Sequence, residues 1–197
     1  MGRHLEFDKQ DVLASAMQVF WRKGYAETSM QDLAEACGIN KASIYNTWTN
    51  KEQFFFAVID FYCESITLQN AEELRGQDSG RAAIEAYFDG QIRFLCHEGH
   101  GLGCFLTNTA GELGFTSPPI IERLRKIFLE MMENFMGAVR RGQEDGSIVR
   151  DEDPLMLALT LQNALQGIRM LARAGDPPEH VLRSIVRLSL RCLDSKA

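Results

Sequence analysis

Hydrophobic residues recur every three to four positions along most of this 197-residue chain, and no segment alternates in the way of a half-buried strand. Residues 9–23 show the pattern clearly, because Val12, Ala16 and Phe20 fall on one face and Gly24 follows the last turn. A helix of this kind buries one stripe and ends at the glycine. The pattern therefore predicts an all-α protein.

Two short helices are predicted next, joined by a tight turn at residues 38–40 that contains a glycine. Thr28 is expected to cap the first helix and Asn40 the second, since both side chains can accept a backbone hydrogen bond. In the second helix Ile44 and Trp48 form the only large apolar pair, which we assign to the core. The opposite face is small and polar, so the two helices are predicted to form a helix-turn-helix that can enter a DNA groove.

The rest of the chain is also predicted to be helical. Glycine-rich breaks and prolines at the first helical positions, Pro118, Pro154 and Pro177, indicate where helices end and begin. The expected helices cover about residues 51–74, 81–97, 104–113, 118–144, 154–174 and 177–193. Together with the first three they make about nine helices, which we divide into a helix-turn-helix domain at residues 1–52 and a second helical domain at residues 53–197.

Composition narrows the class of function. The net charge is -6 and the pI about 5.3, which counts against a protein that coats nucleic acid through phosphate neutralisation, so DNA binding must come from a local surface. The chain has no run of about 18 apolar residues, and its start is charged, so we expect a soluble, cytoplasmic protein with no membrane association. Five cysteines without a C-x-x-C pair suit a reducing compartment rather than a disulfide framework.

Few other motifs carry chemistry. Cys96, His97, His100 and Cys104 are four soft metal ligands close together, but buried, inert cysteines are the expected alternative, and we predict no metal and no cofactor. Cys104 could instead act as a redox-sensing thiol beside a cavity. The sequence contains no G-x-S-x-G, H-E-x-x-H or P-loop pattern, so no enzymatic activity is predicted.

Residues 7–54 resemble the DNA-binding domain of the TetR family of transcriptional regulators. In combination the matching residues are highly specific, and the chain's length and predicted helix count agree with the family. The matching residues are Ala16, Phe20, Gly24, Tyr25, Thr28, Ser29, Asp32, Leu33, Ala34, Gly38, Ile39, Asn40, Lys41, Ile44, Tyr45, Trp48, Asn50, Lys51 and Glu52.

The resemblance implies which side chains meet DNA. A helix N-terminus, basic side chains and hydroxyls would hold phosphates, and the small polar face would read base edges, where an asparagine can pair with adenine. An arm at residues 2–4 would reach a minor groove. The residues that would contact phosphates are Thr28, Ser29, Lys41, Tyr45 and Lys51, and those that would face bases are Ala42, Ser43 and Asn46. Thr47 also belongs to the DNA-binding set, but it departs from the family, which commonly has a phosphate-contacting histidine or tyrosine at this position.

The resemblance also implies a ligand cavity among the middle helices and a dimer formed by the last two. Residues 155–171 and 181–193 support the dimer, since they are more apolar than a two-helix surface should be, although they could instead close a monomeric core. Apolar walls with a few polar anchors suit a small, mostly hydrophobic ligand. The candidate lining residues are Phe88, Gln91, Leu95, Phe105, Asn108, Met131, Phe135, Gln162 and Gln166.

The sequence therefore predicts a homodimer that binds a palindromic double-stranded DNA operator as a repressor and is released by a small-molecule effector. The alternative is a small-molecule-binding or thiol-redox-sensing helical protein whose helix-turn-helix acts as an activator or is vestigial.

Overall fold

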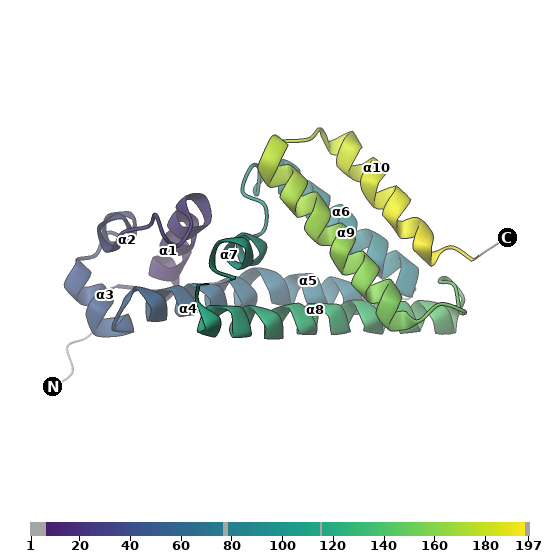
Figure 1. Ribbon diagram of the computed structural model, residues 1–197, viewed down its shortest axis with the longest axis horizontal. Coiled ribbons are helices and arrows are strands. Elements are labelled where there is room, and N and C mark those ends of the chain that lie inside the picture. Colours follow the sequence, from purple (N-terminus) through teal and green to yellow (C-terminus); the bar gives the residue numbers. More distant parts are fainter. Residues whose placement is uncertain (1–6, 77–78, 115, 196–197) are drawn as a thin grey trace.

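A computed structural model describes residues 7–76, 79–114 and 116–195 of the chain, and every regular element in these ranges is helical. Three helices form a compact head at the N-terminal end (Figure 1). They are α1 (Lys9–Lys23), α2 (Met30–Cys37) and α3 (Lys41–Trp48). Their limits agree with the predicted helices within one or two residues.

A long helix leads from the head into the rest of the molecule. It consists of α4 (Lys51–Tyr62), a π-helical segment η1 (Cys63–Thr67) and α5 (Leu68–Arg75). The helices that follow are α6 (Gly80–Cys96), α7 (Phe105–Leu113), α8 (Pro118–Asp145), α9 (Pro154–Gly175) and α10 (Glu179–Ser189), and the 3-10 turn η2 (Leu190–Leu193) continues α10. Counting α4 to α5 as one helix, the described residues form nine helices, which confirms the predicted all-α fold.

One predicted helix start is wrong. The sequence places Asp176 as a cap and Pro177 at the first helical position, whereas α10 begins at Glu179 after Pro178. Asp176 adopts a left-handed backbone with φ 46° and closes α9 instead of opening α10.

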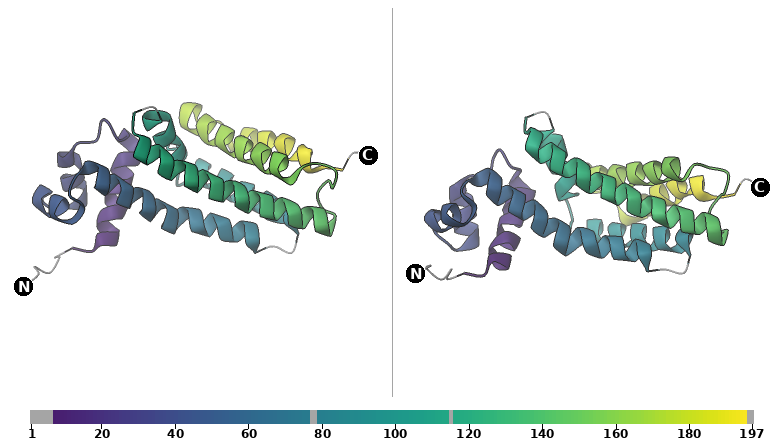
Figure 2. Two further views of the ribbon diagram at one scale, coloured as in Figure 1. Left: turned by 60° about the horizontal axis from the view of Figure 1, so that its bottom comes forward. Right: turned by 90° about the horizontal axis from the view of Figure 1, so that it is seen from below.

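The C-terminal helices pack into a bundle. The α5 and α8 helices run side by side along one edge, α6 and α9 cover them, and α10 packs on α6 and α9 (Figure 2). Buried aliphatic and aromatic side chains from α6, α8, α9 and α10 form one core, centred on residues such as Phe88, Phe135 and Leu161. None of the described helices is both long enough and apolar enough to cross a lipid bilayer.

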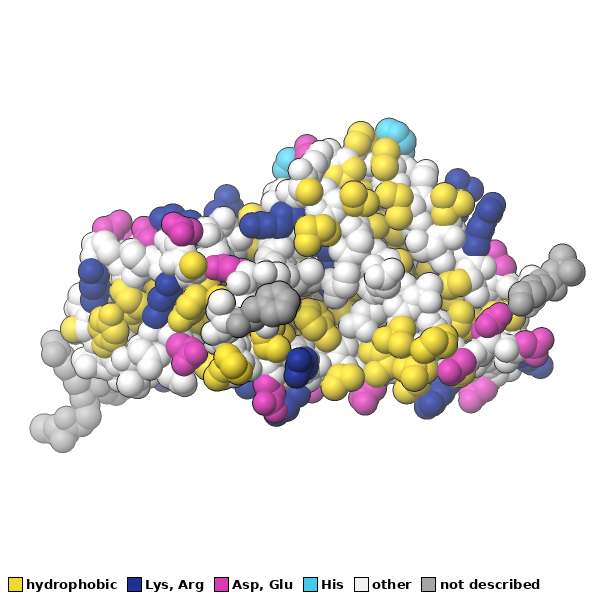
Figure 3. Space-filling model, viewed as in Figure 1, with side chains coloured by type: hydrophobic (Ala, Val, Ile, Leu, Met, Phe, Trp, Pro, Cys, Tyr) yellow, Lys and Arg dark blue, Asp and Glu magenta, His cyan; other side chains and the backbone are white. Residues whose placement is uncertain are grey.

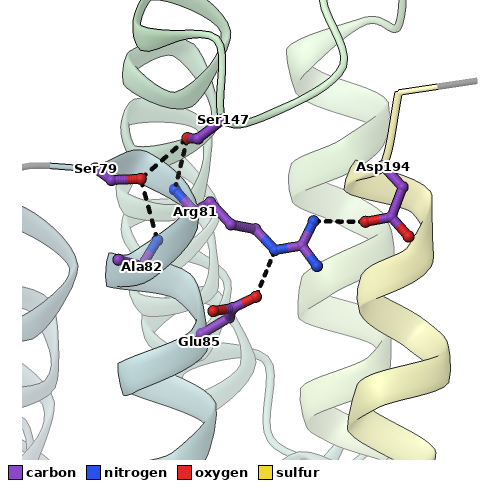
Figure 4. A network of polar contacts seen from close by, with 6 residues as sticks. All are labelled: Ser79, Arg81, Ala82, Glu85, Ser147 and Asp194. Atoms are coloured by element: carbon purple, nitrogen blue, oxygen red, sulfur yellow. Dashed lines mark hydrogen bonds and ion pairs between the residues drawn. The ribbon is translucent and has the colours of Figure 1, made fainter.

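A polar network fastens the end of the bundle that is farthest from the head (Figure 4). The Ser79 hydroxyl, which caps α6, donates to Ser147 Oγ at 3.1 Å. The Arg81 guanidinium donates to Glu85 at 2.6 Å and to Asp194 at 2.8 Å. These contacts join the start of α6 to the loop before α9 and to the C-terminal segment.

A second core joins the head to the bundle. Phe55 of α4 lies edge-on to Phe20 of α1, with ring centroids 4.7 Å apart, and edge-on to Phe105 of α7 at 5.6 Å. Leu124 of α8 belongs to the same cluster. The packing therefore continues across residues 52 and 53, and the orientation of the head depends on side chains from both halves of the chain.

Candidate nucleic-acid interface and internal cavity

The α2–turn–α3 unit has the local interactions of a helix-turn-helix. Ser29 caps α2 in a capping box, because its Oγ accepts from the Asp32 N–H at 3.1 Å and Asp32 Oδ2 accepts from the Ser29 N–H at 2.8 Å. Gly38 ends α2 in the left-handed region with φ 64°, which a residue with a side chain rarely adopts. The Asn40 side chain then accepts from the Ser43 N–H at 2.8 Å and caps α3, as predicted.

Helix α3 presents two different faces. Ile44 is completely buried, and the indole of Trp48 stacks on Phe54 with ring centroids 4.3 Å apart. Trp48 remains half-buried, so its assignment to the core holds for only part of the ring. On the other side the side chains are small, polar or basic and reach solvent. Lys41, Ala42, Tyr45 and Asn46 are exposed, and Ser43 and Thr47 are half-buried.

Two predictions about Thr28, its role as a helix cap and its contact with phosphate, disagree with the structure. Ser29, not Thr28, is the N-cap residue of α2. The Thr28 side chain is only 1% exposed, and its hydroxyl donates to the Gly24 carbonyl at 2.6 Å. A buried and already bonded hydroxyl is not available to a phosphate, so of the two adjacent candidates only the exposed Ser29 lies at the surface.

Lys51 is held in place beside the head. Its ammonium lies 4.4 Å from the centroid of the Tyr25 ring, a cation–π arrangement. Partial burial lowers the pKa of Lys51 and raises the pKa of Tyr25. The predicted arm at residues 2–4 lies outside the described residues.

A partly open cavity of about 440 Å³ lies where α4, α6, the α6–α7 loop and α9 meet. This volume suits a small organic ligand. The side chains and backbone that line it come from Tyr62, Ile66, Glu73, Gly90, Gln91, Arg93, Phe94, Leu95, His97, Glu98, Gly103, Cys104 and Arg169.

The cavity differs from the one predicted, because only Gln91 and Leu95 of the nine candidate residues line it. The buried side chains of Phe88, Met131 and Phe135 belong to the bundle core. Phe105 and Asn108 border a separate hollow between the head and α7, while Gln162 and Gln166 border a shallow groove on the outside of α9. Helical periodicity cannot separate residues on adjacent parts of one buried face, which explains why the candidates are spread over several parts of the structure.

The sequence analysis missed Arg169 and Tyr62, which contribute buried polar groups to the cavity wall. Arg169 is 5% exposed, and its Nη2 donates to Gln91 Oε1 at 2.7 Å. The Tyr62 hydroxyl lies 3.8 Å from Cys104 Sγ. A signal was present, since Arg169 lies within the apolar stripe of α9 that contains Leu165 and Ala172, where a charged residue is unexpected.

Cys104 is buried against this arginine. Burial opposes ionisation of the thiol, but the positive charge of Arg169 acts in the other direction, and the pKa of Cys104 lies below its ordinary value. The other four cysteines are partly exposed, and burial raises the pKa of each of them. Cys104 is therefore the thiol among the five with the greatest thiolate character.

Cys96, His97, His100 and Cys104 do not come together as a metal site. The described residues contain no group of three or more His, Cys, Asp or Glu side chains placed to hold a metal ion. His100 Nε2 instead lies 2.7 Å from Asp176 Oδ1, at the surface.

The cavity and the head share side chains. Trp21 of α1 stacks on Phe94, a cavity residue, with ring centroids 6.0 Å apart, and lies edge-on to Tyr62 at 5.3 Å. The Trp21 indole N–H donates to the Leu102 carbonyl at 3.2 Å, and Arg173 of α9 donates to the same oxygen at 3.1 Å. Side chains of the cavity wall are therefore in direct contact with α1.

A second contact ties the head to α7. The Glu112 carboxylate accepts from the backbone N–H groups of Tyr25, at 2.9 Å, and Ala26, at 2.6 Å. Gly24 precedes them with φ 83°, and a Cβ at this position would lie 2.7 Å from Glu112 Oε2. The loop between α1 and α2 is thus anchored to the C-terminal part of the molecule.

The chain is similar to known proteins along nearly its whole length. Residues 12–58 match the sequence family described as bacterial regulatory proteins, tetR family, and residues 80–187 match the tetracyclin repressor-like C-terminal domain. The HTH-type transcriptional repressor ComR of Escherichia coli (strain K12) is 30% identical over 183 residues, which cover 92% of this chain and 87% of ComR. The HTH-type transcriptional repressor DhaR of Mycobacterium sp. (strain GP1) is 32% identical over 185 residues, which cover 88% of each protein.

A solved structure extends the similarity to three dimensions. A cysteine mutant of the TetR family transcriptional regulator CifR, complexed with 26 bp double-strand operator DNA, matches with a TM-score of 0.87 and 26% identity. The match covers 98% of this chain and 100% of that chain.

Proposed function

Because this chain belongs to the TetR family of bacterial regulatory proteins, we propose that it is a homodimeric repressor that leaves a palindromic operator when a small molecule enters its cavity. The relatives ComR and DhaR are named as repressors, and the similar CifR structure holds operator DNA. The observation that carries the proposal is the outer face of α3, which is small, polar and exposed above the buried Ile44. The proposed regulator acts in the bacterial cytoplasm, and no catalytic role is proposed.

We assign DNA contacts to the side chains that the structure leaves accessible on the head. Helix α3 is eight residues long and enters a major groove with Asn46 and Ala42 towards the bases. Ser29 lies at the N-terminus of α2, where free N–H groups favour a phosphate. The complete proposed set is Ser29, Lys41, Ala42, Ser43, Tyr45, Asn46, Thr47 and Lys51, within a DNA-binding domain at residues 1–52.

We propose that the dimer forms through the last two helices of the ligand-binding domain, residues 53–197. Leu155, Leu159 and Leu171 of α9 and Leu188 of α10 are 37%, 42%, 45% and 52% exposed in the single chain. Hydrophobic side chains gather over α9 on the face shown in Figure 3. Monomeric proteins rarely expose such a patch, and a symmetric partner helix pair would cover it.

The contacts between cavity and head supply the coupling. A ligand that displaces Phe94 or the loop carrying Leu102 also displaces Trp21, and with it α1 and the helix-turn-helix. The π-helical segment η1 adjoins the cavity through Ile66 and gives the long helix a local irregularity of the kind often found at functional hinges. Two half-sites about 34–36 Å apart can be matched by only one spacing of the heads, so ligand and operator oppose each other reciprocally.

Operator binding as a function of salt tests the proposed interface. Each phosphate contact contributes about 0.9 to the slope of log K against log salt, and a dimer has two copies, so Lys41→Ala should reduce the slope by about 1.8. Lys126→Ala is the matched control, since this exposed lysine lies on α8 and its ion pair with Glu122 is only a weak 3.9 Å contact. If the two variants show the same slope as the wild-type protein, the proposed interface is wrong.

A second candidate function is thiol sensing by Cys104. With a peroxide as co-reactant, the Cys104 thiolate attacks one peroxide oxygen, the O–O bond breaks and hydroxide leaves, so the sulfur is oxidised to a sulfenic acid and the peroxide is reduced. The lowered pKa of Cys104 at the cavity wall favours this reading. Hydrogen peroxide should then weaken operator binding in the wild-type protein and in Cys96→Ser, but not in Cys104→Ser. Equal loss in all three proteins would contradict it.

A further inference from the structure

Arg169 is a buried cation without a carboxylate partner in the described part of the chain. Its side chain projects from α9 to the cavity wall and is 5% exposed. Its Nη2 donates to the neutral amide of Gln91 at 2.7 Å, and the hydroxyl of Tyr87 is a second neutral group within hydrogen-bonding reach of the guanidinium. No carboxylate in the described part of the chain forms an ion pair with it. Removing a charge from water without pairing it is costly, so this arrangement needs a reason.

The groups around the guanidinium are uncharged or only weakly acidic. The positive charge acts on Cys104, Tyr87 and Tyr62, and burial raises the pKa of both tyrosines. The Tyr87 hydroxyl is also buried, and its hydrogen bonding with the Arg169 guanidinium opposes this rise in its pKa. The guanidinium is thus buried among groups other than carboxylates, and it also helps to line a cavity of about 440 Å³.

The carboxylates that line the cavity do not supply the missing charge. Glu73 and Glu98 are exposed at its rim, together with the exposed cation Arg93. Arg169 is the only buried cation among the described lining residues. One buried positive charge is neutralised by one negative charge, which favours a monoanion over a phosphate dianion.

We propose that the effector of this protein is a small organic monocarboxylate whose carboxylate binds the guanidinium of Arg169. A carboxylate accepts charge-assisted hydrogen bonds from a guanidinium, and the buried setting strengthens them. The apolar part of the ligand lies against Phe94, Leu95 and Ile66, which line the same cavity. Contact with Phe94 places the ligand against the residue that stacks on Trp21 of the DNA-binding head.

The role of the ligand as effector rests on the proposed function, whereas the carboxylate site itself does not, so ligand binding and DNA release are measured separately. Benzoate, phenylacetate, 3-phenylpropionate and octanoate serve as probes, each beside its neutral primary amide. Binding is followed by calorimetry and by the shift in melting temperature of the full chain. The acids should bind and stabilise the wild-type protein, and the amides should bind at least about 10-fold more weakly, because a hydrogen bond to a charged group contributes about 1.5–3 kcal/mol.

Variants identify the site. Arg169→Met should lose about 10- to 100-fold in affinity for the acids and retain its weak affinity for the amides. Arg140→Met, a substitution of an exposed arginine on α8, should behave as wild type. Arg169→Lys keeps the charge and should retain part of the preference for acids, which keeps the test informative if the methionine variant folds poorly.

The outcomes are distinct. Equal affinity for acids and amides, or no acid in the panel that distinguishes wild type from the Arg169 variants, overturns the proposal. Acid binding that leaves operator affinity unchanged supports the carboxylate site but overturns its role as the effector site. Failure to bind any operator, with acid binding intact, removes the proposed function and leaves the carboxylate site standing.

Discussion

The Glu112 carboxylate offers the sharpest test of how the head is held. It accepts two backbone hydrogen bonds from residues 86 and 87 positions earlier in the chain, Ala26 and Tyr25. In Glu112→Gln one oxygen remains, while the amide NH2 meets the second backbone N–H as donor against donor. The substitution therefore removes one charge-assisted bond and leaves an N–H without its partner.

The magnitude follows from the exposure of these groups. A hydrogen bond to a charged group contributes about 1.5–3 kcal/mol, but Ala26 is exposed and Tyr25 half-buried, so water compensates for part of the loss. We expect a cost of about 1 kcal/mol, which corresponds to a fall of about 2–4 °C in melting temperature for a chain of this size. The same free energy is about a fivefold change in a local opening equilibrium.

Amide hydrogen exchange and thermal unfolding measure both effects. The amide protons of Tyr25 and Ala26 should exchange about fivefold faster in Glu112→Gln, while those in the middle of α1 keep their protection. Glu122→Gln is the matched control, because this exposed glutamate has only a weak ion pair with Lys126. If Glu112→Gln changes exchange and melting no more than Glu122→Gln does, the head is not anchored through this carboxylate.

Three further outcomes are expected. Thr28→Val should lower the free energy of unfolding by about 1 kcal/mol, because the hydrogen bond to Gly24 is lost, and should leave the salt slope of operator binding unchanged. Ser29→Ala should reduce that slope in a gel-shift titration. The reverse pattern would restore Thr28 as a phosphate contact. The hydrogen bond from Lys23, with those from Ser29, holds the pKa of Asp32 far below its ordinary value of about 3.9. The ionised Asp32 therefore stabilises the fold fully above about pH 4, and this effect is lost as the pH falls towards the folded-state pKa. Asp32→Asn should melt at a lower temperature than wild type at pH 7, the difference in melting temperature should narrow in acid, and a difference independent of pH would contradict this. Leu159→Glu should convert the dimer to a monomer in light scattering, with Thr116→Glu as the exposed control that stays dimeric.

In the ligand-binding domain, the sequence could not predict which apolar residues are buried within the chain and which stay exposed. Both Leu159 and Leu161 of α9 belong to an apolar pattern that favours a dimer interface or a monomer core, and the structure divides them: Leu161 is completely buried in its own chain and Leu159 is 42% exposed. Leu159 and Leu161 are two positions apart, so their side chains point about 200° apart around the helix axis. Which of them is buried depends on where α6 and α8 lie. Periodicity gives the width of an apolar face but not which neighbour covers each part of it.

The head was largely determined by local chemistry. The turn at Gly38, the cap at Asn40 and the inward Ile44 are interactions within a few residues, and each is written in the residue types themselves. For this reason the helix limits and the outward face of α3 could be predicted from sequence. Thr28 is the exception, because a neighbouring serine can cap equally well and only the fold buries one of the two hydroxyls.

Residue types and their spacing were enough to predict most helix limits, the helix-turn-helix and the resemblance to the TetR family. Only the tertiary structure decided the contents of the cavity, where Arg169 and Cys104 meet from segments 65 residues apart, and the path from the cavity to the head through Phe94 and Trp21. Local hydrogen bonds and periodicity act over a few residues along the chain. Contacts between side chains distant in sequence arise only when the packing of helices fixes which residues share one buried volume.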